Sequence, residues 1–185
     1  MGWSTHHSTG LIHYAPQHSY RGYTLLVSNS GNIAHLIDME GRICHEWRSD
    51  EGISYGYLLP NGNLLLRTGP AAEETSFLSR PERNLVPGGG RTTSGAILEL
   101  DWDSNVVWEY RYPFLHHDFE RLPNGNTLVL VWKSLPEELA TQVKGGYTDG
   151  SEPGQMLGDA VMEVTAGGEV VDEWRSWEHL SLEED

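Results

Sequence analysis

The sequence has a single cysteine, few cations and no long apolar run. Because Cys44 stands alone, a disulfide within the chain and a zinc knuckle built from cysteines are both excluded. The 12 Lys and Arg residues are outnumbered by 27 Asp and Glu residues, which gives a formal net charge of −15. Nucleic acids and anionic membranes bind cationic surfaces, so this balance argues against both partners. No stretch approaches the roughly 18 apolar residues of a membrane span.

Targeting signals are also missing from the sequence. Residues 1–10 contain no basic segment followed by an apolar run, as a secretory signal does. Gly2 is followed by Trp-Ser-Thr-His, which lacks the Ser or Thr that a myristoylation signal has at the fourth position after the glycine. The 185 residues include seven Trp and eight Tyr, which is too many for a disordered chain. We therefore expect an acidic, soluble, cytoplasmic globular protein in the size range of a single domain.

Two short motifs recur along the chain at nearly the same spacing. The sequence Leu-Pro-Asn-Gly-Asn occupies residues 59–63 and again residues 122–126, an offset of 63. A Glu-Trp/Tyr-Arg triplet begins at Glu46, Glu109 and Glu173, at offsets of 63 and 64, and each triplet follows an apolar segment and a turn. Two unrelated motifs that keep one spacing indicate a structural repeat of about 63 residues.

Each repeat predicts short antiparallel strands joined by tight turns. The Asn-Gly pair tolerates the positive φ of a hairpin turn, so it is expected to join two strands. A short helix is expected within residues 136–143. The predicted strands are 24–27, 34–37 and 43–47 in the first unit, 57–59, 64–67, 96–100 and 106–110 in the second, and 119–122, 127–132, 160–164 and 170–174 in the third.

Four-stranded antiparallel units at a fixed spacing are typical of propeller blades. The predicted fold is therefore all-β: an N-terminal segment, 1–21, followed by a partial β-propeller, 22–185, with about three blades near residues 22–48, 54–111 and 117–175. A β-sandwich is the structural alternative, although it does not require such a repeat. A propeller closes with four to eight blades. We therefore expect a second copy of the chain, or a complementary subunit, to complete the ring.

The alternating strand direction sorts the connections onto two faces of this predicted propeller. The tight turns lie on one face and the long connections on the other, where binding residues usually lie. This distribution predicts an anion-binding face, the alternative being an ordinary polar surface whose acids balance its cations. Nine of the twelve cations fall on the long-loop face: Arg48, Arg67, Arg80, Arg83, Arg91, Arg111, Lys133, Lys144 and Arg175.

His116 and His117, followed by Asp118, stand at the start of the innermost strand of the third unit. The corresponding part of the second unit has no histidine, so the blade architecture does not require the pair. Imidazole suits acid–base work, nucleophilic attack or metal ligation near neutral pH. Side chains alternate along a strand, so one histidine is expected to face the central channel. The alternative is that a histidine caps the strand through Asp118.

Two further residues on the same face are candidates for a binding role. Asp159 opens a strand where the second unit has Gly95, and it is placed to orient a histidine or a ligand hydroxyl. Trp132 ends a strand, where it would stack on an aromatic ligand or pack between blades. The histidine pair with Asp118 and Asp159 makes a poor zinc site, which needs three or four converging ligands. No metal and no cofactor are expected.

Five segments of the chain together resemble the bacterial arylsulfotransferase family. They are residues 22–26 (GYTLL), 36–41 (LIDMEG), 57–63 (YLLPNGN), 116–128 (HHDFERLPNGNTL) and 173–180 (EWRSWEHL). The resemblance runs over nearly all of the chain from residue 20. It implies a six-bladed propeller, of which this chain resembles the N-terminal half. It also implies transfer of a sulfuryl group between phenols through a transiently sulfated histidine, without a nucleotide donor.

The resemblance places the His-Asp segment, chiefly His117, among the residues that contact sulfate. The family's nucleophilic histidine lies in a Trp-Thr/Ser-His-x-Asn-Ser stretch, which these 185 residues do not contain. The first hypothesis is sulfuryl transfer, with cations and an imidazole stabilising the developing charge. The alternatives are a non-catalytic propeller that binds a small anion or a protein partner, and a hydrolase of small aromatic substrates. The candidate catalytic residues are His117 and His116, and the candidate substrate-binding residues are Arg91, Arg67, Arg111, Lys133, Asp118, Asp159 and Trp132.

Overall fold

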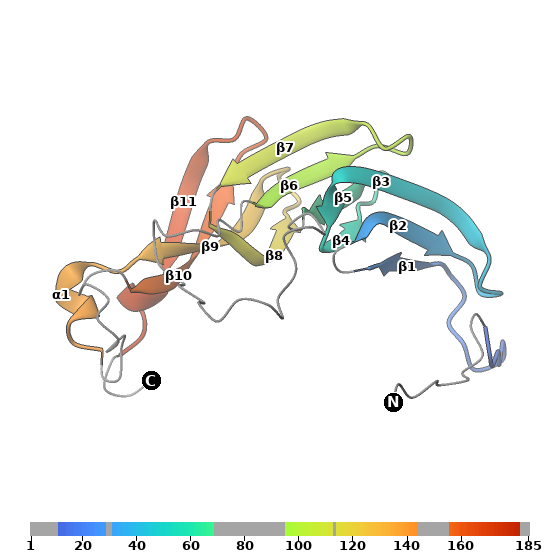
Figure 1. Ribbon diagram of the computed structural model, residues 1–185, viewed down its shortest axis with the longest axis horizontal. Helices are drawn as coiled ribbons and strands as arrows, with labels where there is room; N and C mark the ends of the chain where they lie inside the picture. Colours follow the sequence, from blue (N-terminus) through green and yellow to red (C-terminus); the bar gives the residue numbers. More distant parts are fainter. Residues whose placement is uncertain (1–10, 29–30, 69–94, 113, 144–155, 182–185) are drawn as a thin grey trace, which may run out of the picture.

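The computed structural model describes residues 11–28, 31–68, 95–112, 114–143 and 156–181, and these form an almost entirely β structure (Figure 1). Eleven strands are arranged in three antiparallel sheets. The all-β prediction is therefore confirmed. The sheets of the described residues do not close into a ring. Among those residues, neither short helix has the length and apolar character needed to cross a membrane.

Each sheet is a meander in which strands that follow one another in the chain also pair with one another. Sheet I contains β1 (Thr24–Val27), β2 (Gly31–Ile37) and β3 (Ile43–Ile53). Sheet II contains β4 (Tyr55–Leu58), β5 (Leu64–Arg67), β6 (Gly95–Leu100) and β7 (Val106–Tyr112). Sheet III contains β8 (Leu115–Arg121), β9 (Thr127–Ser134), β10 (Leu157–Val164) and β11 (Val170–Arg175).

The described helices are short and lie in or after sheet III. The helix α1 spans Glu137–Ala140, which is shorter than the expected 136–143 and begins after Pro136, and a 3-10 helix, η2, spans Ser176–Glu178. Pro136 suits a helix start because the first turn requires no N–H from it. The strands differ from the prediction mainly at the ends: β3 continues to Ile53, which is fully buried, and β8 already begins at Leu115.

The repeated Asn-Gly turns have nearly the same geometry in sheets II and III. The N–H of Gly62 donates to the carbonyl of Leu59, and the N–H of Gly125 donates to that of Leu122, each over 2.9 Å. The φ angles of Gly62 and Gly125 are +88° and +86°, a region that side chains with a Cβ rarely adopt. Glycine is needed there because of its backbone angle, since a Cβ would meet open space.

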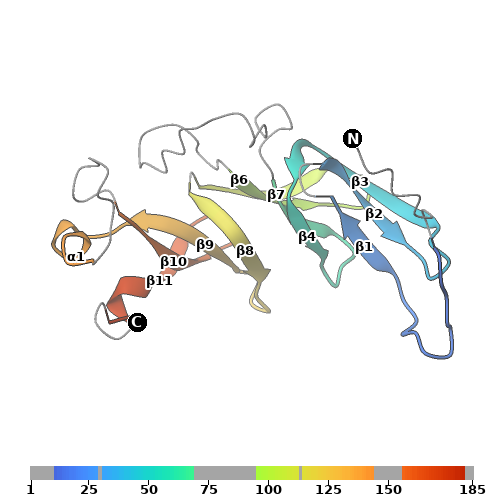
Figure 2. The same cartoon turned by 60° about the horizontal axis from the view of Figure 1, so that its bottom comes forward.

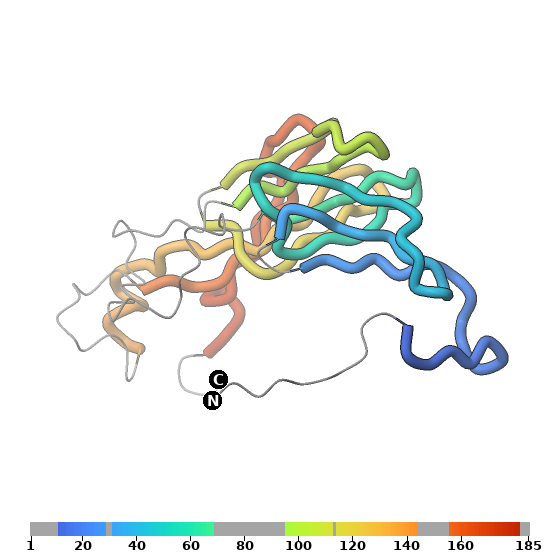
Figure 3. The backbone as a smooth tube through the Cα atoms, turned by 45° about the vertical axis from the view of Figure 1, so that its right-hand side comes forward, coloured from blue at the N-terminus to red at the C-terminus, as the bar shows by residue number. Residues whose placement is uncertain are grey.

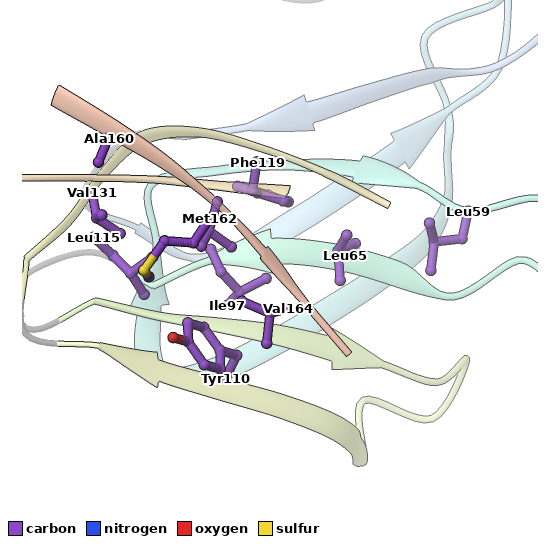
Figure 4. Close-up of a cluster of buried hydrophobic side chains, with 11 residues drawn as sticks. Leu59, Leu65, Ile97, Tyr110, Leu115, Phe119, Val131, Ala160, Met162 and Val164 are labelled. Carbon is purple, nitrogen blue, oxygen red and sulfur yellow. The ribbon is translucent and has the colours of Figure 1, made fainter. Parts of the chain in front are cut away.

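The three sheets stack face to face in chain order, with sheet II in the middle (Figure 2, Figure 3). Side chains alternate along β5, so that Leu64 and Leu66 join the core towards sheet I, whereas Leu65 joins the core towards sheet III. Figure 4 shows the second of these cores, where Ile97 of sheet II meets Met162 of sheet III. Sheet II is therefore buried on both faces, unlike either layer of a two-sheet sandwich.

Candidate functional site

The candidate site is centred on a bulge at the start of β8. Leu115 pairs with Val131 of β9, and Phe119 pairs with Val129. Four steps along β8 thus match two steps along β9, and the surplus residues leave the regular ladder. His117 has a φ of +50°, the left-handed region that is uncommon for a residue other than glycine. Bulges and such backbone angles are concentrated at functional sites.

This bulge corrects the expectation that the two histidines point in opposite directions. The Nδ1 atoms of His116 and His117 lie 2.9 Å apart, and the two rings meet edge to face at 5.1 Å. A regular strand keeps neighbouring side chains apart, so only the irregular backbone permits this contact. One Nδ1 must donate a hydrogen and the other must accept it. At least one of the two imidazoles is therefore neutral while this hydrogen bond persists.

His116 is the buried member of the pair, with 5% of its surface exposed, whereas His117 is exposed. The His116 ring stacks on Trp132 of β9, with ring centroids 4.4 Å apart. Its Nε2 lies 3.3 Å from Oδ1 of Asp159, but the angles are not those of a hydrogen bond, and this buried nitrogen has no hydrogen-bond partner. Burial lowers the pKa of His116, and the charge of Asp159 opposes that effect only in part.

Arg67 ends β5 and brings a second incompletely bonded group to the same region. Its Nε is buried without a hydrogen-bond partner, and within the described ranges its guanidinium forms no ion pair. Burial lowers the pKa of Arg67. The positive charge of Arg67 also lowers the pKa of His116, so the two groups interact electrostatically. Tyr55, opposite Arg67 in the ladder, contacts Phe119 just after the bulge. A cation that is partly buried with no counter-ion among the described residues is unusual.

The other predicted cations that the structure describes are paired with acids of the chain. Arg111 donates to both carboxylate oxygens of Glu51, over 2.9 and 2.7 Å, and also to Glu109. Lys133 and Arg175 both bind Glu173. Arg48 is paired with Glu46. Arg91, like Arg80, Arg83 and Lys144, lies outside the described residues.

Of the remaining candidates, Asp118 bonds to the backbone, whereas Trp132 and Asp159 lie beside His116. Asp118 accepts a hydrogen bond from the N–H of Phe119 over 2.9 Å, so it caps the bulge and is not bonded to either imidazole. Trp132 packs on His116, a role that the sequence did not predict. Asp159 and Trp132 are directly opposite each other in the β9–β10 ladder. Within the described ranges, no three or more metal-ligating side chains gather into a possible metal site.

We expect His116 to make the stability of the fold depend on pH. The unfolded chain binds a proton at this residue near the ordinary pKa of 6.5, whereas the folded chain does so only at lower pH. As the pH falls from about 7, the unfolded state therefore binds more protons, and the free energy of unfolding decreases until the folded-state pKa is reached. Urea unfolding at several pH values should show a shallower slope for His116→Gln than for the wild type. Equal slopes would contradict this prediction.

No protein-family model matches the chain, and no curated protein matches it in sequence.

Proposed function

We propose that this chain binds a small aromatic sulfate at Arg67, His116 and His117 and transfers its sulfuryl group to a phenol. The observation that carries the proposal is a pair of buried nitrogens without a hydrogen-bond partner among the described residues, Nε of the partly buried Arg67 and Nε2 of His116, in groups whose charges influence each other. Both groups would gain hydrogen bonds from a bound anion, and an anion would supply the negative charge that the described residues do not place beside Arg67. The resemblance to arylsulfotransferases supports a sulfate ester as the anion.

The contact between the two imidazoles suggests how they divide the chemistry. If Nδ1 of His117 donates to Nδ1 of His116, the exposed His117 keeps a lone pair on Nε2, and the neutral His116 carries its hydrogen on Nε2. His117 is then the nucleophile, while His116 and Arg67 donate to the sulfuryl oxygens. This arrangement stabilises the charge that develops on those oxygens during transfer.

The reaction then has two balanced steps. In the first, Nε2 of His117 attacks sulfur, so that an N–S bond forms, the ester S–O bond breaks and the donor leaves as a phenolate. In the second, the acceptor phenol attacks the same sulfur, so that a new S–O bond forms and the N–S bond breaks. The acceptor's proton passes to the departing phenolate or to solvent. Trp132 holds the His116 ring in place through both steps.

The test is a transfer assay with 4-nitrophenyl sulfate as donor and 2-naphthol as acceptor. Wild-type protein should form naphthyl sulfate, and His117→Ala should lower the rate by about 10²- to 10⁴-fold. The control is His35→Ala, because His35 is also partly buried but bonds to Glu46 of sheet I. Loss of activity in both variants would contradict the assignment to His117. Release of nitrophenol without an acceptor would instead identify a hydrolase.

A binding protein without catalysis is the second candidate, because the sequence lacks the Trp-Thr/Ser-His-x-Asn-Ser stretch of the resembling family. It predicts that 4-nitrophenyl sulfate binds to the wild type without turnover and that binding depends on Arg67. The absence of both binding and turnover would contradict both candidates.

A further inference from the structure

The two junctions between sheets are built in the same way. Each sheet has a following face, which points to the next sheet along the chain, and a preceding face, which points to the previous sheet. Trp47 on the following face of sheet I packs on sheet II, and Tyr110 on the following face of sheet II packs on sheet III. Two indole N–H groups also donate to backbone carbonyls of the next sheet's turn: Trp47 to Asp101 over 3.1 Å, and Trp108 to Ala166 over 2.9 Å.

The following face of sheet III has the same pattern, but no sheet of the described residues lies against it. Trp174 stands opposite Val161, as Trp47 stands opposite Ala34 and Tyr110 opposite Ile97. Trp47 is fully buried and Tyr110 is 9% exposed, whereas Trp174 is 41% exposed. His179 stacks on the Trp174 ring, but no hydrogen bond from the indole is found in the described part of the chain. The position that is covered at both junctions is therefore open here.

A conserved geometry within the repeat also leaves Glu163 without a cation. Oε1 of Glu99 accepts from Asn61 and Asn63, and Oε1 of Glu163 accepts from Asn124 and Asn126 in the same way. In sheet II the other oxygen of Glu99 binds Arg121 of the next sheet over 2.9 Å, with both side chains mostly buried. The corresponding Oε2 of Glu163 has no partner among the described residues.

Sheet I leaves the complementary face open. Leu25 and Val27 pack towards sheet II, so Leu26 between them points to the preceding face, where it is 47% exposed. The corresponding preceding faces of sheets II and III are formed by residues that are at most 1% exposed: Leu64, Leu66, Ala96, Leu98, Leu100, Thr127, Val129, Ala160, Met162 and Val164. Sheet I thus offers an uncovered version of a surface that is otherwise buried.

We propose that a second copy of this chain docks head to tail, with its sheet I on the following face of sheet III. One chain carries both halves of the contact, and each half has the pattern of the faces that meet at the two internal junctions. The docked copy would bring the turn after β2, with Asp38, to the indole N–H of Trp174. It would also cover the end of the sheet where Oε2 of Glu163 has no partner among the described residues. The two faces differ, so the contact is heterologous and repeats until a ring closes.

The experiment is a measurement of mass in solution, by light scattering and sedimentation, over a wide range of concentrations. The wild type should associate into a closed species whose mass is an integral multiple of 20.7 kDa. Val161→Lys disables the following face, and Leu26→Lys disables the preceding face, so each variant alone should be a monomer. Their mixture should form a two-chain species, because one intact face of each kind remains. The control is Val107→Lys, at an exposed position of β7, which should associate like the wild type.

Circular dichroism establishes that each variant is folded before its mass is interpreted. A wild type that stays monomeric at every concentration would overturn the proposal, because the open faces would then belong to a contact with something other than a second copy. Association that neither variant weakens would also overturn it, as would a mixture that remains monomeric. These outcomes are separate from the anion site, since neither substitution removes a group of that site. The proposal thus goes beyond the proposed function and fails independently of it.

Discussion

Replacing Arg67 by methionine is expected to weaken the binding of 4-nitrophenyl sulfate by roughly 10- to 100-fold, the loss that follows from removing a charged hydrogen-bond donor. The same substitution is expected to stabilise the fold, because a partly buried cation with no counter-ion among the described residues costs desolvation energy that a methionine does not. The gain in the free energy of unfolding should be on the order of 1 kcal/mol. Calorimetric titration and urea unfolding of the same preparation measure the two effects.

Opposite changes in binding and stability distinguish a binding residue from a structural one. The control is Arg42→Met, because Arg42 is 73% exposed on its side chain and pairs with Asp38 and Glu40 at a turn. An exposed pair contributes little to stability, so this variant should bind the aryl sulfate like the wild type. If Arg67→Met destabilised the fold and left binding unchanged, Arg67 would be a structural residue and the proposed anion site would be wrong.

Replacing Trp47 by alanine is expected to lower the free energy of unfolding by about 3–5 kcal/mol, the usual cost of removing a buried large aromatic side chain. Trp47 is fully buried at the junction of sheets I and II and donates to the carbonyl of Asp101. Single domains are stable by about 5–15 kcal/mol, so the variant would retain only part of the stability of the wild type. Denaturant unfolding followed by circular dichroism gives the difference.

The matched variant Trp47→Phe separates packing from hydrogen bonding. It keeps most of the ring volume and loses the indole N–H, so we expect a smaller loss of about 1–2 kcal/mol. Equal losses for the alanine and phenylalanine variants would mean that the hydrogen bond to Asp101, and not the packing of the ring, stabilises the junction. Unchanged unfolding of both variants would contradict the stacking of sheet I on sheet II.

The strands could be predicted from the sequence because their signals are local and repeated. The spacing of the Asn-Gly turns and the Glu-Trp/Tyr-Arg triplets fixed the hairpins, and Gly62 and Gly125 adopt the positive φ that such turns need. Some ion pairs could also have been predicted from the sequence. Glu109 and Arg111 are two residues apart on a strand, so their side chains share a face. These pairs support the ordinary polar surface, whose acids balance its cations, at Arg48, Arg111, Lys133 and Arg175.

The geometry of the histidine pair could not be predicted from the sequence. Alternation along a regular strand separates His116 from His117, and only the register shift between Leu115 and Phe119 brings their Nδ1 atoms together. The absence of a partner for Nε of Arg67 among the described residues is a property of the fold, because it depends on which side chains reach the guanidinium. The short distance between Asp159 and His116 was easier to predict from the sequence, since Asp159 pairs with Trp132 in the β9–β10 ladder.

The most direct test of the anion site is a nitrogen-15 NMR titration of the imidazoles with 4-nitrophenyl sulfate. We predict that the resonances of His116 and His117 shift with one saturable dependence on ligand concentration and that those of His35, which bonds to Glu46, do not. The shifts should disappear in Arg67→Met. Resonances of His116 and His117 that stay unchanged at saturating ligand, or that shift no more than those of His35, would contradict the account.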